Sequence, residues 1–241
     1  MPYELEKLSL LELKKLGQRL ELPANLTKQE LISRIGAEFG HYEEYKKDKL
    51  ERYTRHEQLG KKGKEGITYL VSDKNGKEYA MKTFRKGKSS KTLKKEFDLQ
   101  KKAGKIGVAP KVYDYDIVGK WIVMEKMDRH LITDLTKINL TKADQLRILE
   151  IFRLLDEIKV LQGDVNVINL MVRKNQIYLI DYGFAKEITP ELCRKMKTNH
   201  PNTELMTVGF VIKLKELGAP EKSYHYLLHS LNKDLRKMYG L

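Results

Sequence analysis

The fold is decided by Gly163-Asp164-Val165-Asn166-Val167-Ile168-Asn169 and by Ile180-Asp181-Tyr182-Gly183. Asp164 and Asn169 form an Asp-x4-Asn pattern, Asp181 begins an Asp-aromatic-Gly pattern, and each pattern follows a short apolar stretch. A carboxylate can orient an attacking hydroxyl group, while an amide and a second carboxylate can hold magnesium against nucleotide phosphates. Each pattern alone is common by chance, but the pair indicates phosphoryl transfer.

Three glycines lie upstream, in a segment whose pattern predicts a strand, a turn and a second strand. Glycine lets backbone amides approach phosphates because no Cβ stands in the way. Gly63 and Gly66 have the spacing of a Gly-x-Gly-x-x-Gly loop, whereas the first glycine is displaced to Gly60 and Lys61 takes its place. The spacing favours a phosphate-binding loop and leaves a plain hairpin loop open as the alternative.

A single lysine, Lys82, lies among apolar neighbours on the strand predicted for residues 78–84. Glu96 follows fourteen residues later, inside a helix predicted for residues 90–102. A lysine on a strand is usually solvated. Paired with a glutamate in this way, it can instead hold the α- and β-phosphates of a nucleotide.

Taken in order, the motifs of residues 56–241 resemble those of a small protein-kinase-like domain. Glu78-Tyr79-Ala80-Met81-Lys82 is similar to the kinase Val-Ala-Ile-Lys strand, with Met81 in place of isoleucine. The resemblance implies an α+β fold, bilobal with a reduced C-lobe, that uses ATP and Mg²⁺.

The resemblance also implies roles for particular residues. Asp164 would orient the acceptor, with Lys82 and Glu96 as its catalytic partners, and Asn169 and Asp181 would ligate magnesium. Lys82 would bind the nucleotide together with the glycines of the upstream loop, Gly60, Gly63 and Gly66. Backbone groups of Glu125 and Met127 in the hinge would bind adenine. The segment 121–127 would be the strand that enters this hinge.

The chain departs from ordinary kinases around the catalytic loop. Gln162 and Gly163 replace the His-Arg pair, and that arginine normally reads a phosphorylated activation loop. Asn166 stands where serine/threonine kinases carry a lysine, and no Ala-Pro-Glu follows Asp181. A Gly-Asp pair with a short C-lobe is similar to the atypical RIO and KEOPS-associated kinases and to kinase-like proteins of large DNA viruses. It also resembles aminoglycoside-phosphotransferase-like enzymes, which act on small molecules.

Residues 1–40 form a separate pattern, followed by a charged linker over 41–55. Ser9-x-x-Glu12 and Thr27-x-x-Glu30 are capping boxes that predict two amphipathic helices. The first would use Leu10, Leu13 and Leu16 as its apolar face, and the second Leu31 and Ile35. This pattern resembles the SAP helix-extended-helix motif, which implies DNA binding. Its candidate phosphate contacts are Lys14, Lys15, Lys28 and Arg34. A protein-docking module remains the alternative, since residues 1–40 carry six Lys/Arg and six Asp/Glu.

Charge is distributed unevenly in this chain of 241 residues with a formal net charge of +14. Residues 61–105 hold fifteen Lys/Arg and five Asp/Glu, so the predicted N-lobe carries most of the surplus. Such a surface attracts nucleotides, nucleic acids or acidic proteins, or is merely solvated. Aromatic residues are sparse between the lysines, which argues against a base-stacking platform.

The composition indicates a globular protein with one mid-sized domain and a small one. Its single cysteine, Cys193, excludes an intramolecular disulfide, and no apolar run or charged leader predicts a membrane span or a secretory signal. We therefore expect an intracellular protein with no membrane partner.

Three helices are predicted in the C-terminal half. One spans 141–159, capped by Thr141, with an apolar face of Leu146, Leu149, Phe152, Leu155 and Ile158. A second begins at Thr189-Pro190, since proline suits a first helical turn. A terminal helix is predicted over 224–239.

The favoured hypothesis is an ATP- and magnesium-dependent kinase that acts on serine or threonine of a protein substrate. DNA is an expected partner, through residues 1–40 or through the basic N-lobe. The alternatives are a small-molecule or RNA-linked kinase or ATPase, and a pseudokinase scaffold.

Overall fold

The protein is described by a computed structural model that covers residues 5, 8–23, 25–38, 52–60, 63, 65–85, 87–117 and 119–241. Lys61 and most of the predicted linker over 41–55 lie outside the described residues. The chain divides into two compact units, one of Met1–Thr54 with Ser72–Gly76 and one of Arg55–Val71 with Lys77–Leu241. Over the described part, no helix is both long and apolar enough to cross a membrane.

The N-terminal unit contains the two predicted helices, α1 (Leu10–Arg19) and a helix over residues 28–38. Both capping boxes are confirmed. The Ser9 hydroxyl accepts a bond from Glu12 N at 3.3 Å while Ser9 N donates to the Glu12 carboxylate at 2.9 Å, and Thr27 and Glu30 repeat this exchange. The bonds from Ser9 hold the pKa of Glu12 below its ordinary value.

Leu13, Leu31 and Ile35 form the small core between these helices. Leu16 packs against it, half-buried, as predicted. Leu10 is 43% exposed, so its assignment to the apolar face is wrong. It is the first residue of α1 and does not belong to this core or to the residues that pack against it.

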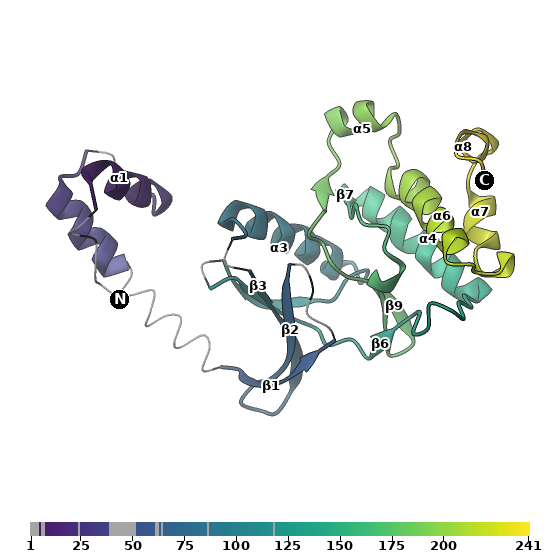
Figure 1. Cartoon of the computed structure of the whole chain (residues 1–241), viewed down its shortest axis with the longest axis horizontal. Helices are drawn as coiled ribbons and strands as arrows, with labels where there is room; N and C mark the ends of the chain where they lie inside the picture. The colour runs from purple at the N-terminus through teal and green to yellow at the C-terminus, as the bar shows by residue number, and fades with distance from the viewer. Residues whose placement is uncertain are drawn as a thin grey trace. The chain divides into compact units, whose positions relative to one another are not determined.

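A five-stranded sheet with the order β1-β2-β3-β5-β4 forms the first part of the larger unit (Figure 1). Its strands are β1 (Thr54–Leu59), β2 (Gly66–Ser72), β3 (Glu78–Phe84), β4 (Val112–Asp116) and β5 (Trp121–Met124). β3 and β4 both pair antiparallel with β5, which places Lys82 opposite Ile122 and Thr83 opposite Trp121. Helix α3 (Ser90–Lys105) packs on the sheet through Leu93 and Phe97.

The second part of this unit is built on helix α4 (Lys142–Glu157), which begins with a capping box between Thr141 and Asp144. Two small antiparallel sheets lie with it. One has the order β6-β8-β9, and the other pairs β7 with β10. The strands are β6 (Arg129–His130), β7 (Val160–Leu161), β8 (Leu170–Arg173), β9 (Gln176–Leu179) and β10 (Lys186–Glu187). The 3₁₀ helix η1 (Val167–Asn169) leads into β8.

The predicted apolar face of α4 is wrong only at Leu146, since Phe152 and Leu155 are buried and Leu149 and Ile158 pack, partly buried, against the same core. Ile148 and Ile151 are also buried, whereas Leu146 is 47% exposed. The apolar residues of this segment cover more than one helical face, so their spacing alone did not show that Leu146 is exposed.

Five helical segments lie between β10 and the last helix. They are α5 (Pro190–Met196), the π-helix η2 (Asn202–Met206), α6 (Thr207–Glu216), η3 (Glu221–Ser223) and α7 (His225–Ser230). Thr189 caps α5 as predicted, with Pro190 in the first turn. The single terminal helix predicted over 224–239 is wrong. α7 ends at Ser230, and α8 (Lys233–Met238) starts anew because the Asn232 side chain accepts a bond from Leu235 N at 2.8 Å. The expected α+β class is confirmed.

Candidate active site

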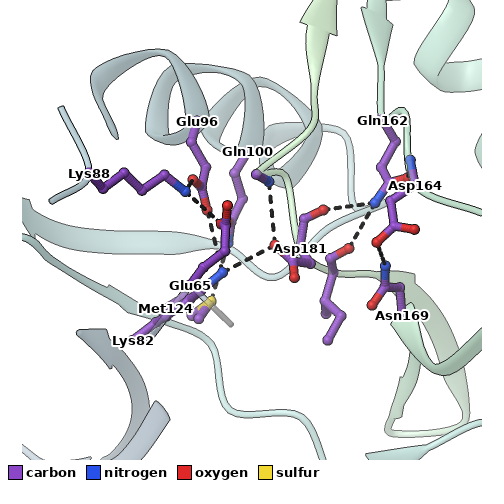
Figure 2. A network of polar contacts seen from close by, with 12 residues as sticks. Glu65, Lys82, Lys88, Glu96, Gln100, Met124, Gln162, Asp164, Asn169 and Asp181 are labelled. Atoms are coloured by element: carbon purple, nitrogen blue, oxygen red, sulfur yellow. Dashed lines mark hydrogen bonds and ion pairs between the residues drawn. The ribbon is translucent and has the colours of Figure 1, made fainter. Parts of the chain in front are cut away.

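Lys82 lies between two carboxylates that come from distant parts of the chain (Figure 2). Its ammonium nitrogen is 3.5 Å from Glu96 Oε1 on α3 and 3.1 Å from Asp181 Oδ1, which follows β9. Glu96 is buried, whereas the Asp181 side chain is 38% exposed. Three of the residues predicted from the sequence therefore share one cluster, with Asp181 on its open side.

Two further charged residues, Glu65 and Lys88, join this cluster. Lys88 Nζ lies 2.5 Å from Glu96 Oε2 and 2.6 Å from Glu65 Oε2. Burial disfavours the charged form of Lys88, but the hydrogen bonds to Glu65 and Glu96 outweigh it and raise the pKa of Lys88 above its ordinary value. The sequence analysis missed both residues, because nothing distinguishes Lys88 from the other lysines of residues 61–105.

The catalytic-loop candidates form a second cluster. Asn169 Nδ2 donates to Asp164 Oδ2 at 2.8 Å, and Asn166 N donates to Asp164 Oδ1 at 3.1 Å. The Asn166 side chain in turn accepts a bond from Ile168 N at 3.3 Å and so caps η1. The Asp-x4-Asn spacing thus brings the Asn169 amide within hydrogen-bond distance of the Asp164 carboxylate, because the chain between them turns through the short helix η1.

Gln162 connects the two clusters (Figure 2). It has no exposed surface, and its Nε2 donates to the backbone carbonyls of Ile180 and Asp181 at 3.2 and 2.8 Å. Its Oε1 accepts a bond from Asp164 N at 2.7 Å. One buried amide therefore sets the position of both acidic motifs. The sequence showed Gln162 only as a replacement for histidine, and its place before Gly-Asp was the one available signal.

The buried carboxylate of Asp156 on α4 supports Gln162 through Asn202. Asp156 accepts bonds from the backbone and side chain of Asn202 at 3.0 and 2.7 Å, and also from Thr203. Asn202 then accepts a bond from Gln162 N at 3.2 Å and donates to the Val160 carbonyl at 2.8 Å. This chain of contacts anchors the catalytic loop on α4 and η2.

The backbone takes unusual conformations on both sides of the site. Gly163 has φ +80°, and a Cβ at this position would lie 2.8 Å from the Phe184 carbonyl oxygen. Asp181 has φ +61° and accepts a bond from Gly183 N at 3.3 Å. Gly163 is therefore required by the fold of the loop, where an arginine would not fit.

The three glycines of the upstream loop lie in different structural environments. Gly60 has φ +70° in open space, whereas Gly63 N donates to the Gly66 carbonyl at 3.0 Å. A Cβ on Gly66 would lie 2.1 Å from the Thr83 carbonyl oxygen. The close approach of β2 to β3 alone thus accounts for Gly66, and phosphate contact is not needed to explain it.

The two hinge candidates follow β5. Glu125 N donates to the Lys111 carbonyl at 2.9 Å, and its carboxylate pairs with Arg173 at 2.8 Å. Of the backbone groups of Glu125, the carbonyl is the one that adenine could use. Met127 is buried, at 9% exposure.

A surface cavity lies elsewhere in this unit. It measures about 490 Å³ and is lined around α5 by residues that include Lys159, Cys193, Arg194 and Lys197. A smaller one of about 200 Å³ lies beside the hinge and includes Glu125 and Arg173. We identify the site from the charged contacts around Lys82 and Asp164, because the larger cavity shares no residue with them.

The donor set suits a hard divalent cation. Carboxylate oxygens of Glu65, Glu96 and Asp181 lie within 4.8 Å of one another, but Lys88 already binds the first two, so Asp181 is the member of this group that suits a metal. Asn169 uses its amide nitrogen on Asp164, so its oxygen is the atom it can offer to a metal. Magnesium prefers such oxygen ligands, and when bound it would neutralise charge on nucleotide phosphates.

Comparison with known proteins assigns the chain to a family. The model of the RIO domain matches residues 55–196, which is more than half of the chain. A search of curated proteins gives no match. The matched region contains the Lys82, Asp164 and Asp181 motifs, so the chain belongs to the RIO family, a family of atypical kinases and ATPases that bind ATP with magnesium.

Proposed function

We propose that the chain is an ATP- and magnesium-dependent phosphotransferase whose acceptor is a serine or threonine hydroxyl of a protein. One observation carries this proposal. A continuous set of contacts runs from Lys82 through Asp181 and Gln162 to Asp164. These contacts connect Lys82, the cation that would bind the nucleotide phosphates, to Asp164, the carboxylate that would accept a hydrogen bond from the acceptor hydroxyl.

Each side chain has a role that follows from its position. Lys82 would hold the nucleotide phosphates, and Glu96 would orient Lys82 from the buried side. Asp164 would accept a hydrogen bond from the attacking hydroxyl and align it. Asn169 would hold Asp164 in place through its amide nitrogen. Asp181, with Asn169, would ligate magnesium.

The first prediction tests this assignment with three substitutions. Lys82→Met and Asp181→Asn should each reduce phosphate transfer by orders of magnitude, because one removes the charge on the phosphates and the other a metal ligand. Asp164→Asn should reduce turnover while nucleotide binding persists. The measurement is transfer from γ-labelled ATP to a panel of proteins, RNAs and amino-alcohols, with nucleotide affinity measured separately.

Lys94→Met serves as the control, since Lys94 forms an exposed ion pair with Asp98 on α3. Full activity of Lys82→Met together with loss of nucleotide binding in Asp164→Asn would contradict the assigned roles. Absence of nucleotide binding in the unmodified protein would instead support the pseudokinase scaffold.

An ATPase or small-molecule kinase is the second candidate, and Asn166 favours it. Its side chain caps η1 and so is directed to the loop's own backbone. This position therefore lacks the lysine charge that serine/threonine kinases place near the γ-phosphate. Release of inorganic phosphate without any labelled acceptor, abolished by Lys82→Met, would identify this activity.

We also propose that the N-terminal helix pair is a SAP-like module that tethers the enzyme to DNA. Lys14, Lys15, Lys28 and Arg34 all lie at the surface of its two helices, where phosphates could reach them. Tethering would raise the effective concentration of a DNA-bound protein substrate. Docking on a protein is the alternative role for the same helices.

A further inference from the structure

Lys88 makes the shortest ion pairs of the active-site cluster. It binds Glu96 at 2.5 Å and Glu65 at 2.6 Å, whereas Lys82 lies 3.5 Å from Glu96. The Lys88 side chain is 11% exposed, so these contacts are poorly screened by solvent. A cation held this closely contributes to the geometry of both carboxylates.

The two lysines use different oxygens of Glu96. Lys82 contacts Oε1 and Lys88 contacts Oε2, so one carboxylate serves both without competition. The Glu96 side chain is only 3% exposed, and a buried carboxylate oxygen without a donor is costly. Lys88 therefore fixes the orientation in which Glu96 presents Oε1 to Lys82.

Glu65 is held at both ends by the segment that carries Lys88. Its backbone carbonyl accepts a bond from Arg85 N at 3.0 Å, and its carboxylate binds Lys88 Nζ. The segment is itself fixed, because Lys88 N donates to the Arg85 carbonyl and Lys120 Nζ donates to the Lys88 carbonyl at 2.8 Å. Lys88 thus connects the glycine-rich loop to α3.

The same contacts bring Glu65 close to the Asp181 motif. A Cβ on Gly183 would lie 2.4 Å from Glu65 Oε2, so the Glu65 carboxylate lies directly against the backbone of Gly183. The carboxylate of Glu65 therefore reaches from the glycine-rich loop to the residues that follow Asp181 (Figure 2). Its negative charge would repel nucleotide phosphates unless a cation neutralised it, and Lys88 is that cation.

We propose that Lys88 is a positioning residue of the nucleotide site. It acts through Glu96 on Lys82, and through Glu65 on the position of the start of β2 beside Gly183. The inference rests on the proposed function, since it concerns the same nucleotide. It adds a residue for which no role was predicted from the sequence.

The test compares Lys88→Met, Lys88→Arg and Glu65→Gln with Lys94→Met in the full-length protein. Three quantities are measured: hydrogen exchange of the amides of residues 63–68, affinity for mant-ADP, and KM and kcat for ATP. We expect Lys88→Met to accelerate hydrogen exchange in this loop. It should also weaken the binding of mant-ADP by roughly tenfold, the scale of one charge-assisted hydrogen bond. It should also raise KM for ATP more than it lowers kcat.

The matched variants separate positioning from general destabilisation. Lys88→Arg should restore most of the affinity, because a guanidinium can also bridge two carboxylates. Glu65→Gln should reproduce the faster loop exchange, and combining it with Lys88→Met should add little further. If Lys88→Met is poorly folded, Lys88→Arg and Glu65→Gln still decide the question.

The outcomes for Lys88 and for the proposed function are distinguishable. If Lys88→Met and Glu65→Gln match Lys94→Met in loop exchange and mant-ADP affinity, the inference is overturned, even in an active enzyme. If loop exchange and affinity change as expected while the unmodified protein transfers phosphate to no acceptor, the positioning role stands and the proposed transferase activity fails.

Discussion

At the scale of single residues, Gln162 stands where ordinary kinases carry a histidine and connects the two acidic motifs through its amide. Its two functional atoms bond in opposite directions, one to the carbonyls of Ile180 and Asp181 and the other to Asp164 N. A histidine would have one ring nitrogen for each of these two roles, and its charge varies near neutral pH. Glutamine supplies donor and acceptor together at every pH, so this connection does not titrate.

The second prediction concerns Gln162→Met. The change keeps the volume but leaves Asp164 N and two carbonyl groups without their partner, and each such group costs about 1–3 kcal/mol. We expect a loss of a few kcal/mol in the free energy of unfolding, measured by urea denaturation, and a larger loss of turnover than Lys94→Met gives.

Gln100→Met is its control. Gln100 is also buried, but its amide donates to the Met124 sulfur at 3.2 Å, a weak acceptor. Equal destabilisation by the two substitutions would show that the stability lost in Gln162→Met comes from burial and not from the connection between the motifs.

The third prediction concerns Gly163→Ala. The left-handed conformation costs a non-glycine residue about 1–2 kcal/mol, and the new Cβ would also lie 2.8 Å from the Phe184 carbonyl. Gly218→Ala is the matched control, since Gly218 has φ +74° with no atom within 4 Å of its built Cβ. Gly163→Ala should therefore lower the melting temperature more than Gly218→Ala, and should reduce turnover because Asp164 is the next residue.

The same glycine bears on regulation. Because no arginine fits at this position, the enzyme should need no prior phosphorylation for activity. Loss of activity after phosphatase treatment would contradict this reading.

The site could be predicted only where residue type and order carry the information. Lys82, Glu96, Asp164, Asn169 and Asp181 stand in motifs whose order along the chain is informative by itself. Glu65, Lys88 and Gln162 were missed, because their importance comes from distances of 2.5–2.8 Å between segments far apart in sequence. Charge and residue type alone do not distinguish them.

At the scale of secondary structure, start signals were the most reliable part of the sequence. Ser9, Thr27, Thr141 and Thr189 each begin a helix as predicted, because a side-chain oxygen satisfies backbone donors locally. The exposure of Leu146 on α4 and the break between α7 and α8 were not predicted, since both depend on neighbours that the local sequence does not contain.

The fourth prediction concerns the packing of α4. Ile148→Ala should destabilise the protein by about 2–5 kcal/mol, because the side chain is fully buried in the main core. Leu146→Ala, two residues earlier and 47% exposed, should cost less than about 1.5 kcal/mol. Urea denaturation of the two variants checks this, and a larger effect for Leu146→Ala would restore Leu146 to the apolar face predicted from the spacing.

At the scale of the whole molecule, the two units differ in charge. Residues 1–40 carry no net charge, whereas residues 61–105 carry a surplus of ten positive charges. Nucleic-acid binding through phosphates depends on how many of them a protein neutralises. The two units should therefore differ in how steeply their DNA affinity falls with salt.

The fifth prediction concerns DNA binding by the N-terminal helix pair. If the four candidate residues Lys14, Lys15, Lys28 and Arg34 make the phosphate contacts, they neutralise at most four phosphates and the log–log salt slope should be no steeper than roughly −3.6. Replacing Lys14 and Lys15 with alanine should reduce the slope by about 2. Deleting residues 1–51 should leave phosphorylation of a free peptide unchanged and reduce that of a DNA-bound substrate.

A gel-shift comparison of the helix pair, the kinase-like unit and the full chain identifies which unit binds. If only the kinase-like unit shifts DNA, the helix pair is a protein-docking element, and the basic surface of residues 61–105 accounts for the binding.

Trp121 is the one tryptophan of the chain, and it lies buried on β5 opposite Thr83, beside the residue that pairs with Lys82. Indole emission therefore comes entirely from the five-stranded sheet, whereas the helices after α4 contain tyrosines but no tryptophan. Indole fluorescence, excited where tyrosine does not absorb, would therefore follow the unfolding of the sheet without any label. Comparing that signal with far-ultraviolet circular dichroism, to which the helices contribute strongly, would show whether the sheet and the helices unfold in one cooperative step or in two.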